Sequence, residues 1–220
     1  MNTVIIDYGA GNRRSVERIL SHLGVQSQQS ADPDVIAAAD LLVLPGQGAF
    51  ASAMAALEKD ELSNLIRNHI KQGKPFLGIC LGFQVLFEGS EEKGYTQGLG
   101  IFPGVFKEFS HDMPVPHMGW NTLNIKPEAP KYFQAVPERL APSEVEVSRG
   151  VSDPSVYFVH SYYLDETNPN IVYSTTDYGH PFVSAIYGPN LLATQFHPEK
   201  SGVVGLALLQ GFLDKIRIAA

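Results

Sequence analysis

The sequence predicts an α/β fold, with a mostly parallel central sheet, helices on both faces and antiparallel strands added in the C-terminal half. Two observations support this. In the first half, apolar runs rich in β-branched residues alternate with segments whose apolar residues recur at helical spacing. In the second half, strand-like pieces follow one another with only turns between them. We expect residues 1–220 to form one domain, because a chain of this length buries enough surface without a disulfide or a metal.

The first half contains three predicted strands that are apolar almost throughout, as expected of strands buried on both faces of a parallel sheet. The second of them ends at Pro45 and Gly46, a pair typical of turns. Two segments carry apolar residues at helical spacing, and each is followed by a glycine typical of a helix C-terminus. The strands are TVIID (3–7), LLVL (41–44) and PFLGIC (75–80), and the helices are SVERILSHL (15–23) and ELSNLIRNHIKQ (61–72).

The second half contains four strand-like segments that turn signals separate, which predicts antiparallel pairing. A nearly all-apolar segment, GVVGLALLQGFLDKI (202–216), predicts a final helix packed into the core. The polar, proline-containing stretch at 137–155 predicts a surface excursion. The four strand-like segments are VYFVHSYYL (156–164), NIVYSTTDYG (170–179), FVSAIYGP (182–189) and NLLATQF (190–196).

Composition excludes several classes of function. The formal net charge is −7 and the lysines and arginines are scattered, which argues against nucleic-acid binding and against a basic membrane-binding patch. No apolar run is long enough to span a membrane, and the N-terminus lacks the features of a signal peptide. The single cysteine cannot form an internal disulfide, which favours a reducing cytoplasm. Histidines at metal-ligand spacing are absent, so we expect neither a metal nor another cofactor.

That single cysteine, Cys80, lies in GICLG, where a predicted strand passes into a helix. G-x-C-x-G is the thiol form of the nucleophile elbow, in which a sharp turn exposes the nucleophile at the carboxyl edge of the sheet. Flanking glycines are needed there because side chains would collide with neighbouring elements. A helix N-terminus also favours thiolate over thiol. The alternative is an inert cysteine that is simply buried at a strand end.

A thiolate that performs acyl chemistry needs a base and a group that orients the base. Of seven histidines, His22 and His69 lie in helical patterns that predict exposure to solvent, and two more lie in polar, turn-like stretches (111 and 180). His117, His160 and His197 remain as candidates. His197 is favoured because Glu199 follows two residues later, within reach of the imidazole if the chain is extended. The alternative for HPE alone is a turn with a solvated charge.

An oxyanion hole would complete such a site. The backbone N–H of Leu81, the residue after the nucleophile, is one expected donor. A second donor is expected from PGQG, through Gly46, Gln47 and Gly48, because this loop follows a neighbouring strand and its glycines let the backbone approach a substrate. Taken alone, PGQG also fits an ordinary Pro-Gly turn.

Taken together, these motifs resemble those of the class I (triad) glutamine amidotransferases. Within that family the sequence is most similar to the glutaminase subunits of imidazole glycerol phosphate synthase. The shared motifs occur in the family's order from residue 6 to residue 202, so the resemblance covers nearly the whole chain. They are IDYGAGN (6–12), PGQGAF (45–50), GICLGFQVLFE (78–88), PHMGWN (116–121), YFVHSYY (157–163) and QFHPEKSG (195–202).

The resemblance implies a reaction and a partner. Cys80 would attack the carboxamide of L-glutamine, His197 would transfer protons and Glu199 would orient His197, while Gly46 and Gln84 would help to hold the substrate. The ammonia would pass to a (β/α)₈-barrel cyclase subunit of a heterodimer, which forms the imidazole ring in histidine biosynthesis. Asn12, in the YGAGN loop, and Trp120 would then lie at the interface between the subunits.

Three departures from the subfamily pattern stand out. Gln47 replaces a small β-branched residue, and we expect its bulkier polar side chain to change how easily the oxyanion loop rearranges. Arg13 stands where leucine is common, which we interpret as a surface change. The segment at 137–155 is longer than usual.

Other functions fit parts of this pattern less well. GAGNRR after the first strand is not a dinucleotide-binding loop, because Arg14 occupies the position of the third glycine. An amidotransferase of an aromatic or purine pathway would share the triad, but PHMGWN and YGAGN favour the histidine pathway. A free-standing thiol hydrolase and a non-catalytic interaction subunit stay open, although the second is disfavoured because all three triad residues are present. Trp120 also fits a core or interface filler.

Overall fold

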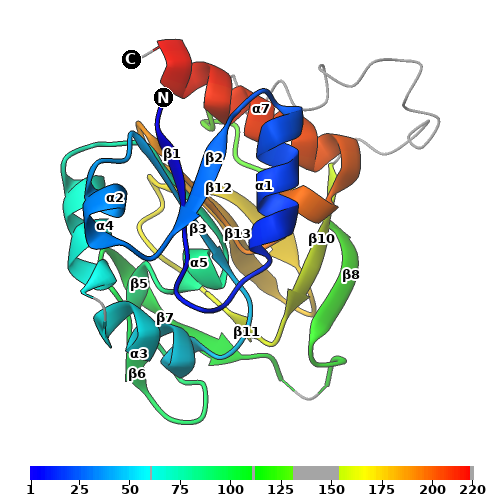
Figure 1. Ribbon diagram of the computed structural model, residues 1–220. Coiled ribbons are helices and arrows are strands. Elements are labelled where there is room, and N and C mark those ends of the chain that lie inside the picture. The colour runs from blue at the N-terminus through cyan, green and yellow to red at the C-terminus, as the bar shows by residue number, and fades with distance from the viewer. Residues whose placement is uncertain (60, 111, 131–153, 219–220) are drawn as a thin grey trace.

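The computed structural model describes residues 1–59, 61–110, 112–130 and 154–218, and at its centre lies an eight-stranded sheet (Figure 1). Five neighbouring strands of this sheet are parallel and three at one side are antiparallel, which confirms the predicted fold class. The predicted surface excursion at 137–155 falls almost wholly outside the described residues. In sheet order the strands are β2 (Ser27–Ser30), β1 (Thr3–Ile6), β3 (Leu41–Gly46), β4 (Phe76–Cys80), β14 (Leu191–Thr194), β13 (Pro181–Tyr187), β12 (Val172–Asp177) and β9 (Asn124–Ile125).

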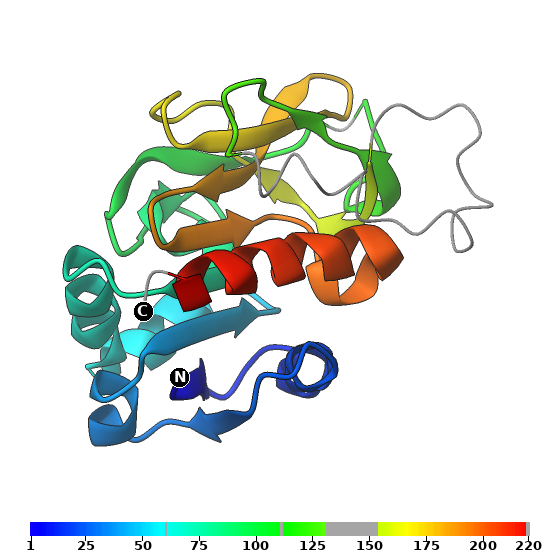
Figure 2. The ribbon, with the colours of Figure 1, turned by 90° about the horizontal axis from the view of Figure 1, so that it is seen from above.

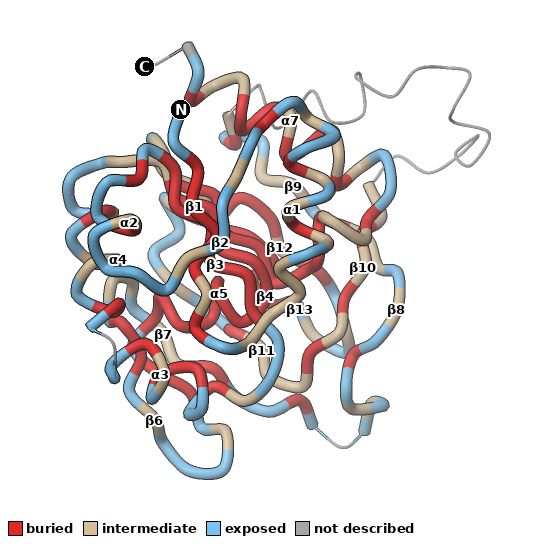
Figure 3. Tube along the Cα trace, in the orientation of Figure 1, coloured by how far each residue is buried: buried red, intermediate tan, exposed pale blue. Residues whose placement is uncertain are grey.

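Helices cover both faces of the sheet because its strands are apolar on both sides. Successive residues of a strand point to opposite faces, so Val4 and Ile6 of β1 join one buried cluster and Ile5 joins the other. Helices α2 (Pro33–Ala37), α3 (Phe50–Lys59) and α4 (Leu62–Lys71) contribute to the first cluster. Helices α1 (Arg13–His22) and α7 (Gly202–Ile218) contribute to the second. Figure 3 shows the central strands as the most deeply buried part of the trace.

The last strand along the chain, β14, differs in part from its prediction. It was expected to be antiparallel, and it is antiparallel to β13 but parallel to β4. The reason is geometric: the short connection after Tyr187 reverses the chain, so β14 runs in the direction of the first-half strands. All four of its residues are buried, as is typical of a parallel strand covered on both faces.

Two smaller sheets flank the central one. One is a two-stranded antiparallel ribbon of β8 (His117–Thr122) and β10 (Ser155–His160), which lies beside the start of α7 (Figures 1 and 2). The other contains four strands, in the order β11 (Tyr162–Tyr163), β7 (Phe102–Glu108), β5 (Phe87–Ser90) and β6 (Thr96–Gln97). In the described part of the chain, no helix combines the length and the apolar character needed to cross a membrane.

Candidate active site

Cys80 lies at a sharp turn between β4 and the short helix α5 (Leu81–Gln84). Its backbone angles, φ 54° and ψ −107°, fall in a region that residues other than glycine rarely adopt. The flanking glycines make this turn possible. A Cβ atom at Gly82 would collide with the backbone oxygen of Leu44, and one at Gly78 would lie 2.8 Å from the oxygen of Gly82. The predicted elbow and the predicted need for its glycines are confirmed.

His197 and Glu199 lie where β14 leads into a short 3₁₀ helix, η1 (Pro198–Lys200). Nδ1 of His197 lies 2.9 Å from Oε1 of Glu199, and both side chains are almost fully buried. The main chain at His197 is fixed as well, because His197 N donates to the oxygen of Tyr157 at 2.9 Å and Ser201 Oγ donates to the oxygen of His197 at 2.6 Å. The extended conformation at His197 therefore brings the two side chains together, as the HPE spacing predicted.

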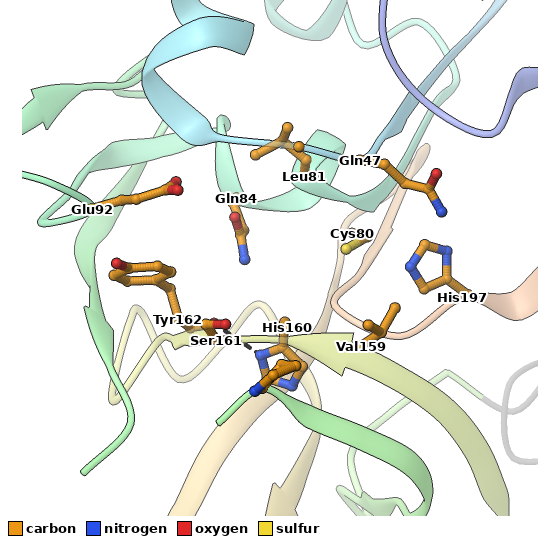
Figure 4. Close-up of a pocket in the computed structure, with 12 residues that line it drawn as sticks. Gln47, Cys80, Leu81, Gln84, Glu92, Val159, His160, Ser161, Tyr162 and His197 are labelled. Carbon is orange, nitrogen blue, oxygen red and sulfur yellow. Dashed lines mark hydrogen bonds between the residues drawn. The ribbon is translucent and has the colours of Figure 1, made fainter. Parts of the chain in front are cut away.

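The second ring nitrogen of His197 faces the thiol. Nε2 is buried and has no hydrogen-bond partner among the described residues, and His197 and Cys80 line the same pocket (Figure 4). Burial by itself lowers the pKa of His197, but the interactions of the ring with Cys80 and Glu199 outweigh burial and raise the pKa to about 9. A ring with this pKa is protonated at neutral pH and places a positive charge beside Cys80.

The predicted oxyanion segment lies against the elbow. Gly46 ends β3 beside Cys80 in the sheet register, and a Cβ atom there would collide with the side chain of Leu81. Gly48 adopts a φ of 113°, which favours glycine, so this turn requires the residue that the sequence has there. Gln47 is exposed at the pocket, and its side chain extends to the neighbourhood of His197 (Figure 4).

The loop that contains Asn12 packs on the same segment. Tyr8 donates a hydrogen bond of 2.9 Å to the backbone oxygen of Pro45, and a Cβ atom at Gly11 would lie 3.0 Å from that oxygen. Asn12 is partly buried and directly precedes α1, and Arg13, interpreted as a surface change, pairs with Asp7. The loop predicted to meet a partner is therefore in direct contact with the segment predicted to bind the oxyanion.

The pocket has a volume of about 330 Å³, enough for a ligand of amino-acid size. The elbow, the end of β3 and His197 line one wall, and the end of β10 and the start of β11 line the opposite wall (Figure 4). Gln84, predicted to hold substrate, lines it as well. The lining residues are Gln47, Gly48, Cys80, Leu81, Gln84, Glu92, Pro116, Val159, His160, Ser161, Tyr162 and His197.

A buried histidine pair supports the opposite wall. Nδ1 of His160 lies 2.8 Å from the oxygen of Tyr162, so it must carry a proton, and Nε2 of His160 must accept the proton of His117 Nδ1 at 3.0 Å. His117 Nε2 then accepts from Asn121 Nδ2 at 3.3 Å. Burial lowers the pKa of His117 to about 4 and that of His160 to about 3, so both rings are neutral at pH 7.

Two predictions about histidines have outcomes in this structure. His22 is exposed, as predicted. His69 is not: its ring is buried and Nε2 lies 2.8 Å from the oxygen of Pro75, where it helps to hold the connection between α4 and β4. The helical pattern identified the right helix but the wrong exposure for this residue. In the described ranges, no group of three or more His, Cys, Asp or Glu side chains is arranged to hold a metal.

Sequence reasoning missed Gln195. Its side chain is fully buried, and its Nε2 lies 3.7 Å from Cys80 Sγ. A signal was available, since Gln195 precedes His197 by two residues and so shares its side of an extended chain.

Comparison with known proteins identifies the family. Residues 4–216 match the model of the family described as "Glutamine amidotransferase class-I". The imidazole glycerol phosphate synthase subunit HisH of Syntrophotalea carbinolica is 46% identical, over 96% of this chain and 98% of its own. The subunit of the same name from Thermosynechococcus vestitus is 48% identical, over 97% of this chain and 96% of its own.

Solved structures share the fold at lower sequence identity. A crystal structure of a glutamine amidotransferase superposes with a TM-score of 0.70 at 15% identity, covering 96% of this chain and 97% of the other. The structure of PurLQS from Thermotoga maritima gives 0.69 at 16% identity, covering 98% of both chains. Because its relatives match along nearly its whole length, this chain belongs to the class-I glutamine amidotransferases, in the group of HisH subunits of imidazole glycerol phosphate synthase.

Proposed function

We propose that the chain hydrolyses L-glutamine to glutamate and ammonia, in the cytoplasm. We also propose that it passes the ammonia to a (β/α)₈-barrel cyclase subunit, with which it forms a heterodimer in histidine biosynthesis. The observation that carries the proposed chemistry is the 2.9 Å contact between His197 and Glu199, in the pocket that holds Cys80 at a strained elbow. The subunit name of the relatives supports the pathway.

In the proposed reaction, the Cys80 thiolate attacks the carboxamide carbon of glutamine. The negative charge moves to the carboxamide oxygen, where N–H groups of Leu81 and of the Gly46–Gly48 segment stabilise it. Protonated His197 gives its proton to the departing nitrogen. Ammonia is released, and the glutamyl group stays bound to Cys80 as a γ-glutamyl thioester. His197 then takes a proton from water as the water attacks the thioester, and glutamate and the thiolate are released. Glu199 keeps the proton of Nδ1 in place throughout.

Substitution of the nucleophile tests this proposal. In the complex with the cyclase, we expect Cys80→Ala to abolish glutamine-dependent product formation and to leave ammonia-dependent formation intact. The ammonia-dependent rate is the internal control for folding and assembly. Glutamine-dependent turnover in this variant would exclude Cys80 as the nucleophile. A glutamine-mimicking alkylator should label wild type only at Cys80, the chain's single cysteine.

Dependence on the partner separates the proposal from a free-standing thiol hydrolase. The contacts of Tyr8 and Gly11 with Pro45 connect the predicted interface loop to the oxyanion segment, so we expect docking to raise the glutaminase rate. The gain should reach roughly 100- to 1,000-fold, the usual worth of one oxyanion donor. A subunit that works at full rate alone would contradict this. Stimulation by an aromatic or purine synthase, and not by the cyclase, would place the chain in another pathway.

A further inference from the structure

Gln195 connects the thiol to Gln84 through a buried chain of amide hydrogen bonds. Gln84 Nε2 donates to Gln195 Oε1 at 3.0 Å, and Gln195 Nε2 lies 3.7 Å from Cys80 Sγ. Gln195 itself has no exposed surface, and its backbone N–H donates to Ser184 O at 2.9 Å, which fixes it to β13. The amide is therefore held against the sulfur from both its backbone and its side chain.

The chemistry of Gln84 and of the sulfur decides which groups donate and which accept in these hydrogen bonds. If the Gln195 amide were turned over, its NH₂ group would face the NH₂ group of Gln84 and its oxygen would face the sulfur. Unless the Gln84 amide turned over as well, the two NH₂ groups would face each other, and the Gln195 oxygen would repel a thiolate, at a buried position where unsatisfied polar groups are costly. The arrangement present gives the sulfur an N–H donor. Gln84 itself lines the pocket in which a ligand would bind.

We propose that Gln195 is a further catalytic residue, which stabilises the Cys80 thiolate by an N–H···S hydrogen bond and which Gln84 holds in the donating orientation. A hydrogen bond to a charged acceptor is about twice as strong as one to a neutral acceptor, so the donor favours thiolate over thiol. It complements His197, which supplies positive charge. The proposal rests on the proposed function for its reaction, but the ionisation of the thiol can be measured without any substrate.

The single cysteine makes that measurement direct. We suggest recording the rate of alkylation by iodoacetamide against pH for wild type and for Gln195→Met, which keeps the volume and removes the donor. We expect the alkylation midpoint to rise by about one pH unit, a tenfold change in the thiolate–thiol ratio. Gln84→Met should give a smaller rise, because Gln195 keeps its amide but loses the group that orients it. Gln97→Met, at an exposed position of β6, is the matched control and should leave the midpoint unchanged.

A second variant keeps the test decisive if Gln195→Met does not fold. Gln195→Glu is nearly isosteric and places a carboxylate beside the sulfur, so its midpoint should rise further than that of Gln195→Met. Folding of each variant is checked by circular dichroism and Tm. A folded Gln195→Met or Gln195→Glu with the wild-type midpoint would overturn the proposal. A raised midpoint together with no glutaminase activity in the wild-type complex would instead overturn the proposed function and leave the role of Gln195 in thiol ionisation standing.

Discussion

The wall of the pocket that carries Cys80 and the wall that faces it differ in what holds their residues in place. Close packing of backbone around Gly46, Gly78 and Gly82 fixes the Cys80 wall, where added methyl groups would meet main-chain atoms or the Leu81 side chain. The opposite wall is fixed by side-chain hydrogen bonds, from Asn121 through the buried histidine pair to the carbonyl of Tyr162.

The difference continues to the surface. Behind the Cys80 wall, the strands β1, β3 and β4 are buried, whereas β8, behind the opposite wall, presents Met118 and Trp120 with 64% and 60% of their surfaces exposed. We conclude that the nucleophile depends on rigid main-chain packing. The facing wall depends on a polar network that begins on β8, the strand that carries Met118 and Trp120.

The largest effect is expected from breaking the rigid wall. Gly82→Ala places a Cβ atom against the backbone oxygen of Leu44, which cannot rotate away. We expect a loss of about 3 kcal/mol in the free energy of unfolding, at the upper end for overpacking, together with loss of glutaminase activity. Urea denaturation measures the first quantity. Gly188→Ala is the control, because its nearest neighbour, Leu191 Cβ, lies at an ordinary 3.5 Å. Equal stability of the two variants would contradict this view of the elbow.

An intermediate effect is expected from titrating the opposite wall. Burial lowers the pKa of His117 and His160 in the folded state, so the unfolded chain binds protons first as the pH falls below about 6.5. Stability should therefore decline from pH 6.5 to about 4 for His117 and to about 3 for His160. Each ring contributes up to about 1.4 kcal/mol per pH unit.

Variants at single histidines assign this decline. His160→Gln removes one titrating ring and should make the decline of stability with falling pH less steep. His22→Gln, at an exposed position, should leave it unchanged. The measurement is the free energy of unfolding by urea between pH 4 and pH 7. If both variants show the wild-type slope, the buried pair does not govern acid sensitivity.

The smallest effect on the isolated chain is expected from Trp120→Ala. The side chain is 60% exposed, so Tm should hardly change. If Trp120 is an anchor at the proposed interface, affinity for the cyclase should fall by about 2 kcal/mol. Calorimetry of the two subunits measures it. Tyr95→Ala, exposed to a similar extent on the β5–β6 hairpin, is the control. Unchanged affinity would show that Trp120 is not an anchor of the interface.

The sequence predicted best where one residue type is physically required. Glycine after α1 and α4 follows from backbone limits that act locally, and these elements lie where expected. Glycine on both sides of Cys80 belongs to a recognisable motif, although the contact that requires Gly82 comes from Leu44 of β3. The two-residue spacing of His197 and Glu199 likewise needs no knowledge of the fold. For the helix ends and for the pair of His197 and Glu199, the interaction is contained within a few consecutive residues.

Contacts between residues far apart in the sequence were not predicted, because no pattern of consecutive residues encodes them. His117 and His160 were kept as candidates for the base, yet they pair across the β8–β10 ribbon, a partnership that no local pattern encodes. The burial of His69 depends on the chain returning at Pro75. The position of Gln195 against Cys80 depends on β14 pairing beside β4, and that direction of pairing was only half predicted.

The left-handed turn at Cys80 has a consequence for chains that lose their thiol. Backbone in this region costs about 1–3 kcal/mol for a residue with a side chain, and glycine largely avoids that cost. A Cys80→Gly copy should therefore fold at least as readily as the active one, because only a small side chain is lost from the elbow. Such a copy would lack the nucleophile and yet keep the surface expected to bind the proposed cyclase.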